Sequence, residues 1–191
     1  MCIRDRGGLV VYNALANRLG ITPLSESDFN IRFLEMPFYG RLYERWDYGG
    51  VNADNVMIYE FSRPMQLSIE HWRRFESKTY HALYPQEAIV SGNPLDVILG
   101  GASPRIDIVN KSSDLAGGKI LVVGDDNAFS FLPFLTQSYE SVTFLDAQLM
   151  TDGELQKVNS NEYDTVLFTF TLENYLNSEL PKNAALMSAD F

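Results

Sequence analysis

The 191-residue chain contains little cysteine and little histidine. Its single cysteine, Cys2, excludes an internal disulfide and a cysteine-based zinc site. Its two histidines, His71 and His81, are too few for a histidine-rich metal site. We therefore expect neither a metal ion nor a cofactor to be bound by this chain.

Long hydrophobic runs and positive charge are also scarce. No apolar run reaches the ~18 residues of a transmembrane helix, so we expect no transmembrane segment in this chain. Lysine and arginine number 15 against 25 aspartates and glutamates, which gives a net charge of −10. An acidic surface repels phosphate backbones, so nucleic acid is not an expected partner. Hydrophobic residues make up 46% of the chain and aromatic residues 13%, which is enough for a globular core.

The first six residues, MCIRDR, do not contain the apolar segment of a signal peptide. This string resembles a translated sequencing adapter of the kind found at the start of assembled environmental sequences. We therefore expect residues 1–6 to be an artefactual leader. Residues 7–191 would then be the C-terminal portion of one α/β domain that is incomplete at its N-terminus. The other interpretation is an ordinary N-terminus that frays.

The clearest structural pattern lies in the second half of the chain. Apolar segments typical of buried strands alternate there with short helical segments, which predicts a parallel sheet with flanking helices and right-handed crossovers. The expected strands are 119–123, 141–145 and 164–170, and the expected helices are 128–138 and 152–159. In the first half we expect a helix at 9–19, strands or a long loop at 21–40, a strand at 55–61, a helix at 66–84 and a strand around 106–108.

Polar residues follow each of the three expected strands. They are Gly124-Asp125-Asp126-Asn127, Asp146 and Thr171-Glu173-Asn174. Ligands bind at the carboxyl ends of the strands in open α/β sheets, so these residues form the candidate site. An aspartate after a strand also commonly caps the next helix, and Asp126 or Asn127 would then cap helix 128–138. The two interpretations of Asp126 have equal weight here.

A resemblance to a known family rests on several segments in a fixed order. Residues 119–146, KILVVGDDNAFSFLPFLTQSYESVTFLD, resemble the strand-turn-helix-strand unit of the DHHW family, SGNH-hydrolase-like proteins of bacterial surfaces. The resemblance extends from about residue 9 to residue 178. Its other segments are YNALANRLGITPL at 12–24, FYGRLY at 38–43, LGG at 99–101 and YDTVLF at 163–168.

The resemblance implies a three-layer fold of the SGNH or flavodoxin type and an esterase or O-acyltransferase that acts on surface carbohydrate. A serine on the turn after the strand would be the nucleophile, and the Asp-His-His-Trp motif upstream would supply the acid and the base. Backbone amides would form the oxyanion hole. The family further implies an extracytoplasmic or cell-surface location and a partner that is a surface polysaccharide or an acylated glycan.

This chain departs from the family pattern at its reactive positions. Asp126 occupies the serine position, and Asp125 precedes it. The Asp-His-His-Trp motif, expected just before Gly7, is absent. Ala102 replaces the asparagine of the family's Gly-Gly-Asn segment, and Gln148 replaces an arginine. We therefore expect a catalytically inactive copy, a pseudoenzyme, whose site is lined by Gly124, Asn127, Gly100, Gly101, Ala102 and Asp146.

Neither histidine is a convincing replacement for the missing base. Glu70-His71-Trp72 echoes the family motif, but it follows the FYGRLY segment, which is the wrong order. We expect His71 to be a surface or half-buried residue and Trp72 to pack a helix. His81 receives the same interpretation.

One alternative function and one expectation about solubility accompany this interpretation. A glycine turn after a strand, followed by an acid at the end of the next strand, is also typical of nucleotide-binding Rossmann-like enzymes such as S-adenosylmethionine-dependent methyltransferases. Asp146 lies 22 residues after Gly124, close to the expected spacing, although the turn has a single glycine. Because a sheet without its N-terminal strands exposes an edge, we also expect the chain to be prone to aggregation.

Overall fold

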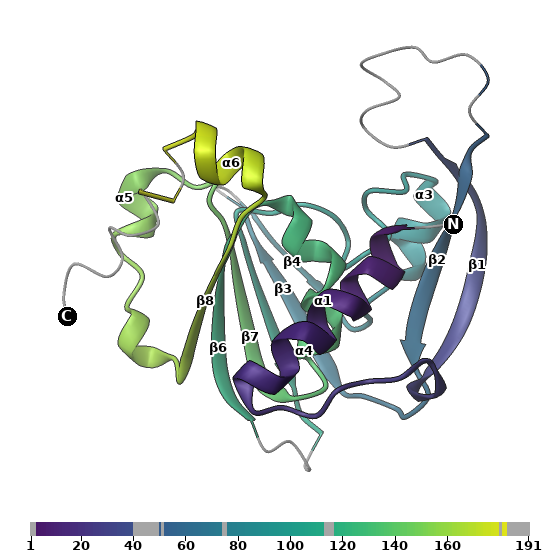
Figure 1. The fold of residues 1–191 in the computed structure, drawn as a ribbon, viewed down its shortest axis with the longest axis horizontal. Coiled ribbons are helices and arrows are strands. Elements are labelled where there is room, and N and C mark those ends of the chain that lie inside the picture. Colours follow the sequence, from purple (N-terminus) through teal and green to yellow (C-terminus); the bar gives the residue numbers. More distant parts are fainter. Residues whose placement is uncertain are drawn as a thin grey trace.

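The computed structural model describes residues 3–39, 50, 52–73, 76–112, 117–179 and 181–182. Most of the FYGRLY segment, residues 40–43, lies outside these ranges. The described chain forms a six-stranded sheet, a separate two-stranded sheet and short helices around them (Figure 1). None of the described helices has the length and apolarity needed to cross a bilayer.

The six-stranded sheet is mixed, whereas the sequence predicted a parallel one. Its order is β4-β3-β5-β7-β6-β8. β6 runs parallel to β7 and β8, as predicted, but β3, β4 and β5 pair in antiparallel fashion. Only residues 73–76 join β3 to β4, which is too short for the crossover that a parallel pair requires. The strands are β3 Leu67–Trp72, β4 Ser77–Tyr80, β5 Arg105–Asn110, β6 Gly117–Gly124, β7 Tyr139–Asp146 and β8 Thr165–Thr169.

The predicted helix at 66–84 is wrong, because β3 and β4 occupy this segment. Leu67, Ile69 and His71 are buried, and they alternate with residues that are not. This period of two is the period of a strand, since successive side chains point to opposite faces. The neighbouring aromatic residues obscure it in the sequence. Trp72 does not pack a helix, because its side chain is 46% exposed.

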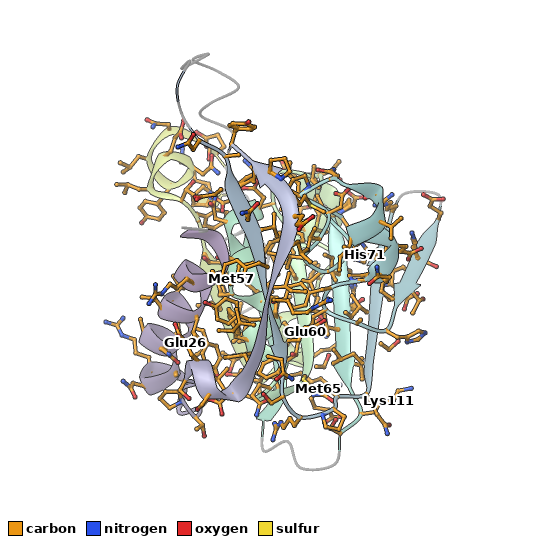
Figure 2. All side chains as sticks on the ribbon, turned by 90° about the vertical axis from the view of Figure 1, so that its right-hand side faces the viewer. Glu26, Met57, Glu60, Met65, His71 and Lys111 are labelled. Carbon is orange, nitrogen blue, oxygen red and sulfur yellow. The ribbon has the colours of Figure 1, made fainter. Side chains whose placement is uncertain are left out.

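The two-stranded sheet pairs β1 Phe29–Phe38 with β2 Asp54–Phe61. The register shifts between Leu34 and Pro37, which is where a residue without an N–H group is tolerated in a strand. Figure 2 views this sheet from its outer side, in front of the larger sheet, with Met57 and Glu60 labelled. Strand β2 confirms the strand predicted at 55–61.

The helices are mostly short. The helix predicted at 9–19 is confirmed and begins at Ile3, so the boundary expected at Gly7 lies inside it and stays a prediction. The helix predicted at 128–138 is instead a 3-10 turn followed by one α-helical turn, with Pro133 near its start. The elements are α1 Ile3–Leu19, η1 Glu26–Asp28, α3 Gln86–Ser91, η2 Asp126–Ser130, α4 Leu132–Leu135, α5 Asp152–Leu155, η3 Ser160–Glu162 and α6 Leu172–Asn177.

Both faces of β6 contribute to hydrophobic clusters. Ile120 and Val122 belong to the main core, which α1, α4, β1 and β2 also form. Leu121 and Val123 belong to a smaller cluster that includes Leu155 of α5. Figure 1 shows α1 and α4 on the side of the sheet that faces β1 and β2, and α5 on the other side. β6 therefore lies between α1 and α4 on one face of the sheet and α5 on the other.

Helix α1 lies directly against the turn that follows β6. A Cβ atom on Gly8 would lie 1.8 Å from the backbone oxygen of Ser130, the last residue of η2. No side chain fits in that space, so the absence of a Cβ allows the two elements to approach. The N-terminal part of α1 is thereby fixed beside the candidate site.

Because of this contact, we expect Gly8→Ala to lower the free energy of unfolding by about 1–3 kcal/mol, the usual cost of overpacking. Gly153→Ala is the matched control, since a Cβ atom there meets nothing within 4 Å and Gly153 lies in helix α5. Urea denaturation of both variants measures the difference. Equal stability of the two variants would show that α1 does not press against η2.

Candidate functional site

The carboxyl ends of the three parallel strands meet in one row, as predicted. Gly124 of β6 is aligned with Asp146 of β7 on one side and with Thr169 of β8 on the other. A Cβ atom on Gly124 would lie 2.0 Å from the backbone oxygen of Thr169. Gly124 is therefore needed for close packing of β6 against β8, which explains the single glycine of this turn.

Asp125 is a buried structural carboxylate. Its side chain is 1% exposed and caps η2 by accepting a hydrogen bond from the Asn127 backbone N–H at 3.2 Å. It also accepts hydrogen bonds from the backbone N–H of Thr171 at 2.7 Å, from the Thr171 hydroxyl at 2.9 Å and from the Asn174 amide at 2.8 Å. The cap therefore comes from Asp125, whereas the sequence interpretation assigned it to Asp126 or Asn127.

These contacts decide the ionisation of Asp125. Burial raises the pKa of its carboxyl group, but the hydrogen bonds from Thr171, Asn174 and Asn127 outweigh it and hold the pKa below its ordinary value. Asp125 is thus a carboxylate at neutral pH, and its oxygens are occupied by donors from η2 and from the start of α6. Of the predicted group at 171–174, Thr171 and Asn174 contact Asp125, whereas Glu173 is exposed.

Asp126 and Asn127 form the exposed part of the turn. Asp126 is half-buried and accepts a hydrogen bond from the Asn127 amide at 3.2 Å, and Asn127 is exposed. Asp126, the residue predicted to occupy the family's serine position, is therefore partly accessible, while its neighbour Asp125 faces inward. A carboxylate, and not a hydroxyl group, is presented at this point of the turn.

Asp146 is a second buried carboxyl group at the same edge. It is 2% exposed and accepts a hydrogen bond from the Gln148 backbone N–H at 2.9 Å. Burial, together with the negative charges of Asp126 and Asp125, raises its pKa to about 6 against the lowering effect of that hydrogen bond. Within the described ranges, no group of three acidic, histidine or cysteine side chains is arranged to hold a metal ion.

The predicted oxyanion segment lies in a tight loop between α3 and β5. Gly100 and Gly101 are buried with positive φ angles of 86° and 91°, and Ala102 is exposed. Gly100 packs on the ring of Tyr80, and Gly101 packs on Asp96. The loop reaches the site through Pro104, whose carbonyl accepts a hydrogen bond from the Asp146 backbone N–H at 2.9 Å. The glycines thus serve the loop conformation, and the end of the loop borders Asp146.

His71 is fully buried, contrary to the expected surface or half-buried position (Figure 2). Its Nε2 atom donates to the backbone oxygen of Leu99 at 2.8 Å, and its ring makes an edge contact with Tyr80. Leu99 has a φ angle of 59°, the one positive φ of a non-glycine residue among the described residues. Burial lowers the pKa of His71. This residue is a neutral brace for the 99–101 loop, whereas His81 is exposed as expected.

The role of Asp125 predicts a large loss of stability when its carboxylate is removed. Asp125→Ala leaves half-buried donors of Thr171 and Asn174 without their acceptor, so we expect a loss of about 2–4 kcal/mol at neutral pH. Asp126→Ala, at the half-buried neighbour, is the control and should lose less than about 1 kcal/mol. The pKa of Asp125 is lowered on folding. Its contribution to the free energy of unfolding is therefore present above its ordinary pKa, and it is lost as the pH falls from that value through the lowered pKa of the folded chain. Equal losses in both variants would contradict this assignment.

The raised pKa of Asp146 predicts the opposite pH dependence. A carboxyl group whose pKa rises on folding stabilises the fold while it is protonated, and this contribution disappears as the pH rises through about 6. Asp146→Asn keeps an oxygen acceptor for Gln148 and does not ionise. Its stability relative to the native chain should therefore improve by about 2 kcal/mol between about pH 4 and pH 7. Glu140→Gln, exposed on the same strand, is the control for charge removal. If the difference in stability between Asp146→Asn and the native chain is the same at every pH in this range, the pKa of Asp146 is not raised.

Comparison with known proteins gives a result at the level of the fold. No family model matches the sequence. No curated protein matches it either. Solved structures do match: a DHHW family protein from Eubacterium siraeum has a TM-score of 0.74 at 16% identity over 94% of this chain. Bacillus cereus PatB1 with a sulfonyl adduct has a TM-score of 0.67 at 15% identity, and a second PatB1 structure has 0.65 at 17%, each over 93% of this chain.

The chain spans 60% of the length of the DHHW family protein and 60% to 62% of the PatB1 structures. The similarity covers nearly all of this chain. The predicted resemblance is thereby supported by structure as well as by sequence order. This chain has the fold of a DHHW family protein.

Proposed function

We propose that this chain is a DHHW-type, SGNH-hydrolase-like domain of the bacterial cell envelope, related to esterases and O-acyltransferases of surface carbohydrate. We further propose that this copy does not itself transfer acyl groups. Its partner would be a surface polysaccharide or an acylated glycan, and its location extracytoplasmic. The three-layer SGNH arrangement and the C-terminal placement of residues 7–191 in a longer domain belong to the same proposal.

The observation that carries this proposal is the turn after β6. Asp126 is half-buried in that turn, and it has a carboxylate where acyl transfer through a serine ester requires a hydroxyl group. Asp125 does not substitute, because its oxygens bind Thr171, Asn174 and Asn127. The turn is packed tightly through Gly124 and Asp125 and presents a carboxylate.

The position of α1 supports the family part of the proposal. The Asp-His-His-Trp motif would lie just before Gly7 in the resembled family, which is the start of α1 here, and Gly8 of α1 packs on the last residue of η2. Side chains just before Gly8 would thus lie beside the turn that contains Asp126. A base and its orienting acid would act from that place in an active relative.

His71 does not supply the missing base. Its Nε2 atom is used by Leu99, and its ring is fully buried against Tyr80. A general base must reach the proton that it removes, and a buried loop brace does not. This geometry agrees with the inactive-copy interpretation.

The alternative of a nucleotide-binding Rossmann-like enzyme has less structural support. Such a turn uses glycine to bring a cofactor phosphate close to the backbone. Here the space next to Gly124 is filled by Thr169 of β8. The acid at the end of β7, Asp146, is buried and bound to the Gln148 backbone, whereas a ribose ligand needs an accessible carboxylate.

We expect neither the native chain nor Asp126→Ser to hydrolyse p-nitrophenyl acetate above the rate in buffer, because a serine alone has neither a base nor an orienting acid. Thermal melting shows whether the variant is folded. Turnover by folded Asp126→Ser that His71→Ala abolishes would mean that His71 acts as the base. Calorimetric heat on titration with S-adenosylmethionine at micromolar concentration would instead support the nucleotide-binding alternative.

A further inference from the structure

The row of strand ends extends beyond the candidate site to Trp72. β3 lies antiparallel to β5, and β5 lies antiparallel to β7, so β3 and β7 end at the same edge. Trp72 closes β3, and its side chain is 46% exposed. Two strand spacings of ~4.8 Å separate β3 from β7, which places Trp72 about 10 Å from the end of β7. An exposed tryptophan therefore lies within reach of the site.

The Trp72 ring is held in place from one side. Its cross-strand neighbour Arg105 places its guanidinium carbon 5.9 Å from the ring centroid. Arg105 is fixed in turn by two hydrogen bonds to Asp107, at 2.8 Å and 3.1 Å. The buried residue Thr143 donates a hydrogen bond to Asp107 at 2.7 Å.

The backbone of Trp72 is fixed as well. The hydroxyl group of Ser103 donates to the backbone oxygen of Trp72 at 3.1 Å. An aromatic ring fixed in this way loses little conformational entropy when a ligand binds to it. Trp72 is therefore held in place before any ligand binds.

On the strand opposite Arg105, the register places small and polar residues next to Trp72. Ser77 is the cross-strand partner of Trp72 on β4, the outer strand of the described sheet. The next pair on the same face is Glu70 with Thr79. Ser77 and Thr79 are exposed, and Glu70 is half-buried. Two hydroxyl groups and one carboxylate thus lie next to Trp72 on the same face of the sheet.

We infer that Trp72 with Ser77, Thr79 and Glu70 forms a stacking subsite for a hexopyranose ring. The C–H face of a pyranose is apolar and packs on an indole, while its hydroxyl groups donate to a carboxylate and exchange hydrogen bonds with serine and threonine. Glu70 and the net charge of −10 disfavour an anionic ligand such as a phosphate. This subsite rests on the proposed function for the origin of the sugar, a surface glycan, but its geometry is independent of acyl transfer.

Fluorescence titration tests the subsite directly. The chain has two tryptophans, so Trp46→Phe makes Trp72 the single indole reporter. We expect cellohexaose or chitohexaose to change its emission in a saturable way. Calorimetry should then show that Trp72→Ala weakens binding about tenfold or more, whereas Trp72→Tyr, which keeps a stacking ring, loses less. Ser77→Leu should weaken binding similarly by covering the free ring face.

Tyr175→Ala is the matched control, because Tyr175 is also an exposed aromatic residue, at 63%, but lies on α6. It should bind the probe as the native chain does. Equal affinity of folded Trp72→Ala and the native chain would overturn the subsite while leaving a glycan partner in place. Absence of binding to both probes would overturn the subsite and also remove the glycan partner from the proposed function. Self-association of the native chain that Trp72→Ala abolishes, measured by sedimentation, would overturn it by making this surface a protein contact.

Discussion

The hydrogen bonds of the Asp125 carboxylate are the interaction on which the site depends. They connect the end of β6 to η2 through Asn127 and to the start of α6 through Thr171 and Asn174. Because Asp125 faces inward, the next residue faces outward, and Asp126 becomes the group that the turn presents. Asp125 thus stabilises the turn, and Asp126 is the carboxylate that the turn presents to solvent.

This division separates the packing of the turn from the group that it presents. Gly124 permits the approach of β8, Gly8 permits the approach of α1, and Asp125 satisfies the donors around the turn. None of these contacts requires a hydroxyl group at Asp126. The packing of the turn therefore does not depend on which functional group stands at position 126.

The sequence predicted those parts of the structure that depend on local pattern. Continuous apolar strands at 119–123 and 141–145 and the Asp-containing turn between them were recognisable because a buried parallel strand has few alternatives. The prediction of a helix at 66–84 was wrong because aromatic residues obscure the alternation of apolar and polar residues in this segment. The burial of His71 could not be predicted from the sequence, because its partner Leu99 is distant in the chain and only the folded sheet brings the two residues together. The same holds for the contact of Trp72 with Arg105, which depends on strand register.

The central claim is that the turn after β6 presents a carboxylate and no activated nucleophile. Treatment of the folded native chain with a sulfonyl fluoride, followed by intact mass spectrometry, tests it most directly, because this reagent modifies an activated serine hydroxyl group covalently. The account predicts that the mass of the chain stays unchanged. A stoichiometric sulfonyl adduct, mapped by peptide analysis to residues 124–130 and abolished by unfolding, would contradict it.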